Sequence, residues 1–349
     1  MGDKVLGLDE LGKKLQKPPA SKDAMLKLLM QLADVLSTIN HGNTELDAIK
    51  KPLVQATIIH NGSKDVQLLA AVCLGYVFKG SAPECPYDNE TLKEVFPLMI
   101  DALRHIGGPN QAGAKRAHEL LQTLAKYKIL LLMLDLDGAS DDLLPELFRV
   151  LLSCAINDQN MYSIDHDVLE VLSVLLDEFD LPKTSKEQDN SLEIQNPLLD
   201  EILRPLMPPQ KDNNPSAYEV TKSLLRRAEN KLQPYVQRFL MEVIDRGTAE
   251  TSDLQGDHRD FIYEIYVAWP ECMISVLPRM TDELQVNVED TRMKAIDLIG
   301  RLLLVPGSTL ASEYRLLFME FMRRFSDRHP SVRLAMLAWA HTYLMVSGE

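Results

Sequence analysis

Apolar residues recur along most of this 349-residue chain at the spacing of amphipathic helices, and the helical stretches come in pairs. The second helix of each pair has the more regular spacing, as residues 64–79 and 330–346 show. No window alternates apolar and polar residues with the two-residue period that marks a half-buried strand. The sequence therefore predicts an all-α fold.

The helix pairs also repeat. The stretch from Asp327 to Ala335 has a partial copy 37 residues upstream, in which Asp290, Arg292 and Ala295 stand in a similar order. In such a repeat the Ala lets neighbouring helices approach, and the Arg can pair with an acid on the adjacent repeat. Helix pairs that recur at about 40 residues are typical of HEAT repeats. We therefore predict a single HEAT-repeat α-solenoid over residues 1–349, with stacked helix pairs that form an elongated curved rod.

The predicted elements are an N-terminal helix and about seven helix pairs, separated by short polar stretches. The helix spans 21–39, and the pairs are 45–60 with 64–79, 91–106 with 112–134, 140–156 with 162–179, 195–207 with 215–230, 231–246 with 255–268, 270–285 with 289–304, and 312–326 with 330–346. Residues before 21 form a polar lead-in, 182–194 a mobile insertion, and 208–215 a stiff proline-rich connector. Because the last helix keeps an apolar face with no polar capping repeat after it, we expect the natural protein to continue beyond this chain.

Composition excludes several classes of function. The chain has 37 basic and 51 acidic residues, a net charge of −14, and a surface of that sign repels nucleic acid. The longest apolar run, Ile129–Leu134, is far too short to span a bilayer. The four cysteines are scattered, as expected for a reduced intracellular compartment. We expect no direct contact with nucleic acid or membrane.

Catalytic and metal-binding motifs are also missing from the sequence. His118-Glu119 begins like the helix of a zinc protease, but Gln122 stands where the second histidine ligand is needed. The acids between Asp135 and Glu146 resemble a calcium loop whose glycine is in the wrong place. Neither a phosphate-binding loop nor a nucleophile elbow is present. We predict that the chain is not an enzyme and holds no metal.

One connector, Ala82–Tyr87, is a candidate docking surface. Its two prolines fix their own φ angles and push the residues before them into extended conformations, so the stretch cannot be helical. It is expected to present Tyr87 at its far end. The alternative is an ordinary stiff connector that leads into a helix capped by Thr91 and Glu94.

A second candidate is the densest basic cluster of the chain, which lies on one predicted helix and its exit and consists of Lys222, Arg226, Arg227 and Lys231. Lys222 and Arg226 lie one helical turn apart and share a face. Arginine presents a fork of donors to phosphate, so the cluster could bind a compact polyphosphate or an acidic peptide. The alternative is a solvated face that pairs with Glu219 and Glu229.

Several stretches resemble one known family. Residues Val72–Tyr87, followed by Leu92–Phe96, are similar to the hallmark of the cohesin-associated HEAT proteins called the precocious-dissociation-of-sisters family, which carries an Ala-Pro-acid-Ala-Pro-Tyr motif here. Asp142–Leu152, Ala217–Arg227 and Phe325–Leu334 resemble successive further blocks of its N-terminal half. The resemblance covers essentially the whole chain in order.

The resemblance implies a non-enzymatic regulatory scaffold of the cohesin complex in sister-chromatid cohesion, located in the nucleus on chromatin. Its partners would be cohesin and its releasing, protecting or acetylating factors, which it would bind through short peptide motifs. The alternative is a HEAT adaptor for transport or complex assembly unrelated to cohesin.

The resemblance also implies site residues. The docking motif falls on Ala82, Pro83, Glu84, Pro86 and Tyr87, with Cys85 where the family usually has Ala. Family members bind inositol hexakisphosphate on this half, to which Lys222, Arg226 and Arg227 would contribute. The family's contact with the kleisin subunit of cohesin is expected mostly beyond this chain.

Overall fold

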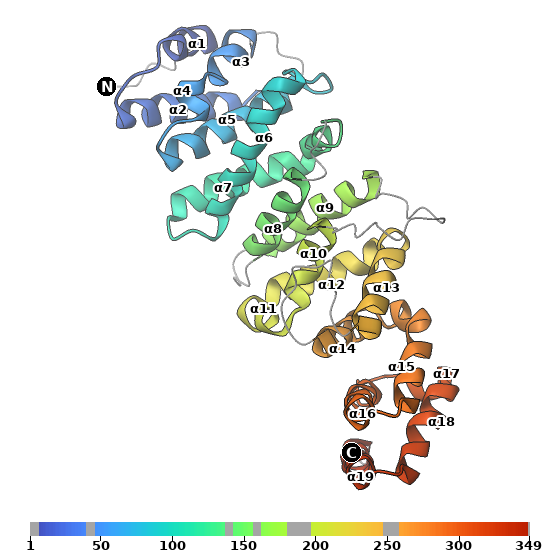
Figure 1. The fold of residues 1–349 in the computed structure, drawn as a ribbon. Coiled ribbons are helices and arrows are strands. Elements are labelled where there is room, and N and C mark those ends of the chain that lie inside the picture. Colours follow the sequence, from blue (N-terminus) through green and yellow to red (C-terminus); the bar gives the residue numbers. More distant parts are fainter. Residues whose placement is uncertain are drawn as a thin grey trace. The chain divides into compact units, whose positions relative to one another are not determined.

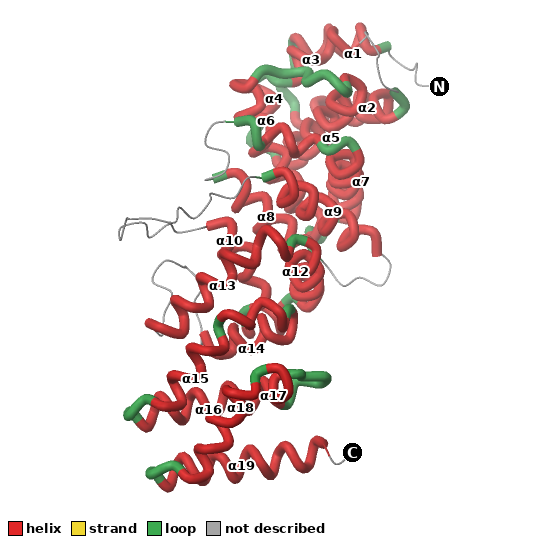
Figure 2. The backbone as a smooth tube through the Cα atoms, turned by 90° about the vertical axis from the view of Figure 1, so that its right-hand side faces the viewer, coloured by secondary structure: helices red, strands yellow, loops and turns green. Residues whose placement is uncertain are grey.

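The computed structural model describes residues 7–39, 46–136, 142–155, 162–179, 197–246 and 258–347. Within these ranges the regular elements are all helices, joined by short loops, and no residue is in a strand (Figure 2). The predicted all-α class is therefore confirmed. No helix in the same ranges is long and apolar enough to cross a membrane. The insertion predicted at 182–194 lies outside the described residues.

The helices follow the predicted succession closely (Figure 1). Their bounds are α1 Leu8–Gln16, α2 Lys22–Ser37, α3 Asp47–Leu53, α4 Ala56–Ile59, α5 Lys64–Ser81, α6 Asn89–Leu103, α7 Gln111–Lys126, α8 Leu143–Cys154, α9 Tyr162–Glu178, α10 Pro197–Leu203, α11 Pro208–Asn213, α12 Pro215–Arg227, α13 Glu229–Arg246, α14 His258–Ala268, α15 Leu277–Gln285, α16 Glu289–Leu303, α17 Leu310–Glu313, α18 Arg315–Arg323 and α19 Pro330–Ser347. Short 3₁₀ helices follow α6, α7, α10, α14 and α18.

The chain divides into two compact units. One consists of Met1–Ser185 with Asn214–Val220, and the other of Lys186–Asn213 with Thr221–Glu349. In the first unit α2, α5, α7 and α9 pack on one another in sequence order, and α4, α6 and α8 form a second such layer. In the second unit α14, α16 and α19 form one layer and α13, α15 and α18 the other. Each unit is thus a stack of helix pairs, whereas the single solenoid over 1–349 stays a prediction.

Polar contacts between neighbouring pairs show the repeat length directly. Lys22 Nζ lies 2.8 Å from Asp65 Oδ2, a separation of 43 residues. The hydroxyls of Tyr266 and Ser308 lie 2.8 Å apart and are separated by 42 residues. Both contacts join neighbouring parts of the stack at separations close to 40 residues, so the period of about 40 residues predicted from sequence is present in the packing.

The core of each stack lies between the two layers and between successive pairs. Cys73 of α5 and Cys154 of α8 are buried among aliphatic side chains as predicted, with free thiols. Burial raises the pKa of the Cys154 thiol to about 11, so the group stays a neutral core residue. These cysteines contribute volume to the core and no reactivity.

The N-terminal lead-in differs from the prediction. It contains α1, a helix that the polar composition of this stretch concealed. Leu8, Leu11 and Leu15 of α1 are buried, at the i, i+3, i+7 spacing of one helical face. Three leucines at this spacing are enough to attach a short helix to a neighbour, and the sequence analysis assigned no helix to this polar lead-in.

The proline-rich stretch at 208–215 also differs from the stiff connector that was predicted. Residues Pro208–Asn213 form α11. Proline fits the first turn of a helix, where its missing N–H has no partner to lose. Lys211 Nζ then forms an ion pair with Glu264 Oε1 of α14 at 2.7 Å, which holds the helix in place.

The long helix predicted at 112–134 is interrupted. Lys128 adopts a left-handed conformation with φ of 51°, between α7 and the 3₁₀ helix Ile129–Met133. The apolar run that made this stretch resemble one helix therefore belongs to two elements. Its residues Ile129, Leu130 and Met133 are buried.

Candidate functional site

The connector Ala82–Tyr87 leaves α5 directly after Ser81 and is not helical, as predicted. The Ala82 N–H still donates to the Phe78 carbonyl at 3.0 Å, and the Glu84 N–H donates to the Ser81 carbonyl at 3.0 Å. The Ala82–Pro83 peptide bond is cis. The chain thus turns away from α5 within a few residues and remains hydrogen-bonded to its last turn.

The connector has an exposed side and a packed side. Pro83, Glu84 and Cys85 are exposed, and we call these three residues the outer edge. The other three, Ala82, Pro86 and Tyr87, are partly buried. The thiol of Cys85 donates to the main-chain carbonyl of Tyr87 at 3.2 Å, which ties the outer edge to the packed side.

Tyr87 is turned into the protein, whereas the sequence suggested an aromatic tip presented to partners. Its hydroxyl donates to the main-chain carbonyl of Lys50 in α3 at 3.3 Å. Its ring packs edge-on against Phe78, with centroids 5.6 Å apart, and Phe78 in turn stacks on Phe96 of α6. Burial raises the pKa of the Tyr87 hydroxyl, so it remains a protonated donor. Tyr87 thus anchors the connector to α3 and α5.

The contact with Lys50 could not be predicted from the sequence, because the acceptor is a main-chain carbonyl. A second contact that anchors the connector could have been predicted from the sequence, because a glycine stands at position 80, near the end of α5. A Cβ atom at Gly80 would lie 2.7 Å from Leu46 Cδ1, so the last turn of α5 packs against the residue before α3 without room for a side chain. The start of the connector is therefore held as closely as its end.

The helix after the connector begins differently from the prediction. Its N-cap is Asp88, whose Oδ1 accepts the Thr91 N–H at 2.9 Å. Hydrogen bonds from Thr91 lower the pKa of the Asp88 carboxyl, so the cap is charged. Glu94, expected to complete a capping box, instead lies 2.9 Å from His60 Nε2. The predicted cap by Thr91 and Glu94 is wrong because Asp88 already satisfies the first turn.

The surface around the outer edge is acidic. Glu84, Asp88 and Glu90 are exposed carboxylates, and Lys93, one turn into α6, is paired with Glu90 at 3.3 Å. An exposed carboxylate beside a proline ring can bind a short peptide that supplies a cation or an N–H donor. These groups lie on an exposed surface, and the arrangement fits the recognition of such a peptide.

Three members of the basic cluster lie on the last two turns of α12, and Lys231 lies in the first turn of α13. Arg226 and Arg227 are exposed and Lys222 is partly buried. Arg226 Nε donates to the Ala268 carbonyl at 3.2 Å, and Lys222 and Arg227 also have interactions within the protein. The shared face of Lys222 and Arg226 is one that a polyphosphate could contact, but part of its donor capacity is already used. The polyphosphate site stays a prediction.

The histidine that resembled a zinc ligand has a different partner. His118 Nε2 lies 3.3 Å from Asp167 Oδ2 of α9. In the part of the chain that the structure describes, no group of three or more His, Cys, Asp or Glu side chains could hold a metal ion. The resemblance to a calcium loop rests partly on residues 137–141, which lie outside the described residues.

Comparison with known proteins identifies the family. A family model described as "Sister chromatid cohesion protein PDS5 protein" matches residues 23–349. The chain belongs to the PDS5 family of sister chromatid cohesion proteins. The predicted resemblance is confirmed, and membership of PDS5 agrees with the prediction of a protein that is not an enzyme.

Individual PDS5 relatives agree with this assignment. The chain is 31% identical over 339 residues to sister chromatid cohesion protein PDS5 homolog A of Arabidopsis thaliana, covering 95% of this chain and 20% of the relative. It is 30% identical over 294 residues to homolog A of Gallus gallus, and this match covers 84% of the chain and 21% of that relative. The chain thus spans about a fifth of the length of the PDS5 proteins it matches.

A solved structure confirms the fold. The chain aligns with a protein from the "Structure of the Pds5-Scc1 complex and implications for cohesin function", with a TM-score of 0.66 and 19% sequence identity. The alignment covers 97% of this chain and 51% of that one. At this identity the match establishes the PDS5-type helical fold of the chain.

Proposed function

We propose that this chain is part of a non-enzymatic regulatory scaffold of the cohesin complex in sister-chromatid cohesion. The support is its membership of the PDS5 family and the similarity of its fold to the Pds5 of the Pds5–Scc1 complex. The partners proposed on this basis are cohesin and its releasing, protecting or acetylating factors. The proposed location is the nucleus, on chromatin through cohesin. We also propose that the contact with the kleisin subunit lies mostly beyond this chain.

We further propose that the outer edge, Pro83, Glu84 and Cys85, docks short peptide motifs of cohesin regulators. The observation that supports this proposal is that one end of the connector is anchored while its outer edge is exposed. Tyr87 fixes one end through Lys50 and Phe78, while the three outer-edge residues are left exposed. A surface held in one conformation before binding loses little conformational entropy when a peptide binds to it.

The test is capture of nuclear-extract proteins on the purified chain, followed by mass spectrometry. Cohesin subunits and their regulators should dominate the proteins captured by the unchanged chain. Glu84→Lys should remove most of them, because it reverses the charge of the exposed carboxylate without removing any packed group. Helical content, measured by circular dichroism, should be unchanged.

The matched control is Asp212→Lys, which reverses the charge of another exposed carboxylate, in the second unit. It should leave capture intact. If Glu84→Lys captures as much cohesin as the control, the outer edge is not the docking surface. If transport or assembly factors dominate in place of cohesin, the alternative of a HEAT adaptor is supported and the cohesin proposal fails.

Inositol hexakisphosphate is proposed as an ancillary ligand of Lys222, Arg226 and Arg227. Titration calorimetry of the chain with inositol hexakisphosphate tests this, with Arg227→Glu as the variant, since the Arg227 side chain is exposed. We expect the unchanged chain to release or absorb heat on binding inositol hexakisphosphate, and Arg227→Glu to reduce this signal. If the unchanged chain gives no heat of binding, the proposed polyphosphate site is contradicted.

A further inference from the structure

The short helix α3 depends on its neighbours for its position. It has seven residues, and isolated helices shorter than about 12 residues are only marginally stable in water. Lys50 is one of its last four residues, whose carbonyls have no donor within the helix. The Tyr87 hydroxyl donates to the Lys50 carbonyl at 3.3 Å and so supplies the missing donor. The position of the docking connector is therefore tied to the position of α3.

A further neighbour of α3 is α1, the helix that the sequence analysis did not assign. Figures 1 and 2 show the two helices side by side in the first unit. A Cβ atom at Gly12 of α1 would lie 2.6 Å from the carbonyl oxygen of Ala48 in α3 and 3.1 Å from its carbonyl carbon. Both are main-chain atoms, which cannot turn aside as the end of a side chain could. The approach of α1 to α3 therefore requires a glycine at position 12.

Apolar side chains complete the contact around Gly12. Leu8, Leu11 and Leu15 of α1 and Ile49 and Leu53 of α3 are each at most 6% exposed. A close-packed interior has few voids that could absorb a displacement, so it transmits strain from one helix to the next. A change in the place of α1 is therefore expected to move α3.

We propose that Gly12 is a positioning residue of the docking connector, and that α1 sets the place of the connector through α3. α1 locates α3, the Lys50 carbonyl locates the Tyr87 hydroxyl, and Tyr87 locates the outer edge. A side chain at position 12 separates α1 from α3 and lets α3 move away from Tyr87. The consequence for peptide binding rests on the proposed docking function, whereas the displacement of the connector needs no partner.

The test is a double-mutant cycle of Gly12→Ala and Tyr87→Phe, measured by hydrogen exchange. The reporters are the main-chain amides of Glu84 and Thr91, which are hydrogen-bonded and lie on either side of Tyr87. Each single variant should speed exchange at both amides several-fold. Because both variants break the same series of contacts, the double variant should exchange no faster than the faster single variant.

A second variant weakens the same interface without inserting an atom. Leu11→Ala removes most of a side chain that is fully buried. It should also speed exchange at the Glu84 and Thr91 amides, although it places no Cβ against the α3 main chain. If Leu11→Ala had no effect there, the contact between α1 and α3 would not position the connector.

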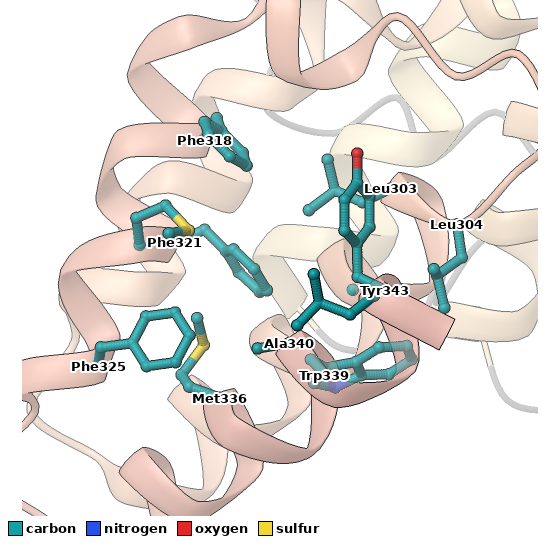
Figure 3. A pocket seen from close by; sticks show the side chains of 12 residues that line it. Leu303, Leu304, Phe318, Phe321, Phe325, Met336, Trp339, Ala340 and Tyr343 are labelled. Carbon is teal, nitrogen blue, oxygen red and sulfur yellow. The ribbon is translucent and has the colours of Figure 1, made fainter. Parts of the chain in front are cut away.

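The matched control is Gly300→Ala, at another glycine in close contact with a neighbouring helix. A Cβ atom at Gly300 would overlap the ring of Trp339. Figure 3 shows this ring at an apolar cavity of about 270 Å³, into which a displaced ring can move. Because Gly300 belongs to the second unit, Gly300→Ala should leave exchange at Glu84 and Thr91 unchanged.

Three results would overturn the proposal. The first is a double variant whose effect is the product of the two single effects, which would mean that Gly12 and Tyr87 act independently. The second is unchanged exchange at both amides in Gly12→Ala. The third is equally faster exchange throughout α7, which would indicate a general loss of stability in the first unit. Since the measurement uses no cohesin, the positioning role can fail while docking stands, and docking can fail while the positioning role stands.

Discussion

Arg292 and Asp327 form a buried ion pair between successive helix pairs, with Arg292 Nε 3.0 Å from Asp327 Oδ2 and each side chain only 2% exposed. Asp327 Oδ1 also accepts the His329 N–H at 3.0 Å, close to the start of α19. One carboxylate therefore pairs with a guanidinium of the preceding helix pair and accepts a main-chain donor of its own pair, and its Oδ2 also accepts from Arg324 Nη1 at 3.2 Å. This contact couples the two pairs more specifically than apolar packing alone.

Removing the Asp327 carboxylate should destabilise the second unit strongly. Asp327→Ala leaves the buried Arg292 charge without its partner, which costs about 3–5 kcal/mol of unfolding free energy. The measurement is urea denaturation followed by circular dichroism. The control is Asp290→Ala, which breaks the exposed pair with Lys294 and should cost about 0.5 kcal/mol or less. Equal losses in the two variants would show that the buried pair does not couple the repeats.

The contribution of Asp327 should also depend on pH. Burial alone raises the pKa of its carboxyl, but hydrogen bonds from the His329 N–H and Arg292 outweigh burial and hold that pKa below its usual value. The folded state therefore releases this proton more readily than the unfolded state, and the stabilisation is present above about pH 4 and lost as pH falls through the folded-state pKa.

The observable is the difference in unfolding free energy between the unchanged chain and Asp327→Asn. This difference should be constant from pH 7 to pH 5 and should shrink below about pH 4. A difference that grew on acidification would mean that the carboxyl is protonated in the folded protein at neutral pH.

The anchoring role of Tyr87 predicts a modest and separable effect of its hydroxyl. Tyr87→Phe removes the hydrogen bond to Lys50 and keeps the ring against Phe78, so it should cost about 1 kcal/mol of unfolding free energy. Tyr343→Phe, at a half-exposed tyrosine of α19, is the control and should change stability by less than about 0.5 kcal/mol. If both variants were neutral, the hydroxyl of Tyr87 would not hold the connector.

The packing of Tyr87 also means that the substitution Tyr87→Ala is unsuitable as a test of peptide docking. Tyr87→Ala would remove a side chain that contacts α3 and α5, and a loss of partner binding would then follow from a disordered connector. Glu84→Lys does not have this difficulty, because its side chain is exposed. The structure thus separates residues that position the docking segment from residues that can touch a partner.

The sequence predicted the fold well where periodicity was strong. The spacing of Val66, Leu69 and Cys73 assigned the buried face of α5 correctly, because side chains at i, i+3 and i+7 must share a face. It predicted α11 wrongly, because proline punctuates helices but is also accepted in their first turn.

The candidate site was only partly predictable. The two prolines correctly indicated a non-helical connector, since their effect on φ is local. The inward direction of Tyr87 could not be predicted, because it depends on a main-chain carbonyl 37 residues away and on a ring in another helix. Long-range contacts of this kind leave no pattern in a single sequence.

The most direct test of the docking surface uses Cys85. It is exposed on the outer edge, whereas Cys73, Cys154 and Cys272 are buried, so Cys85 should react first with iodoacetamide. The measurement is the alkylation rate of Cys85, by mass spectrometry, in the free chain and in the complex isolated with cohesin. The proposed docking predicts alkylation several-fold slower in the complex, and an unchanged rate while cohesin stays bound would contradict it.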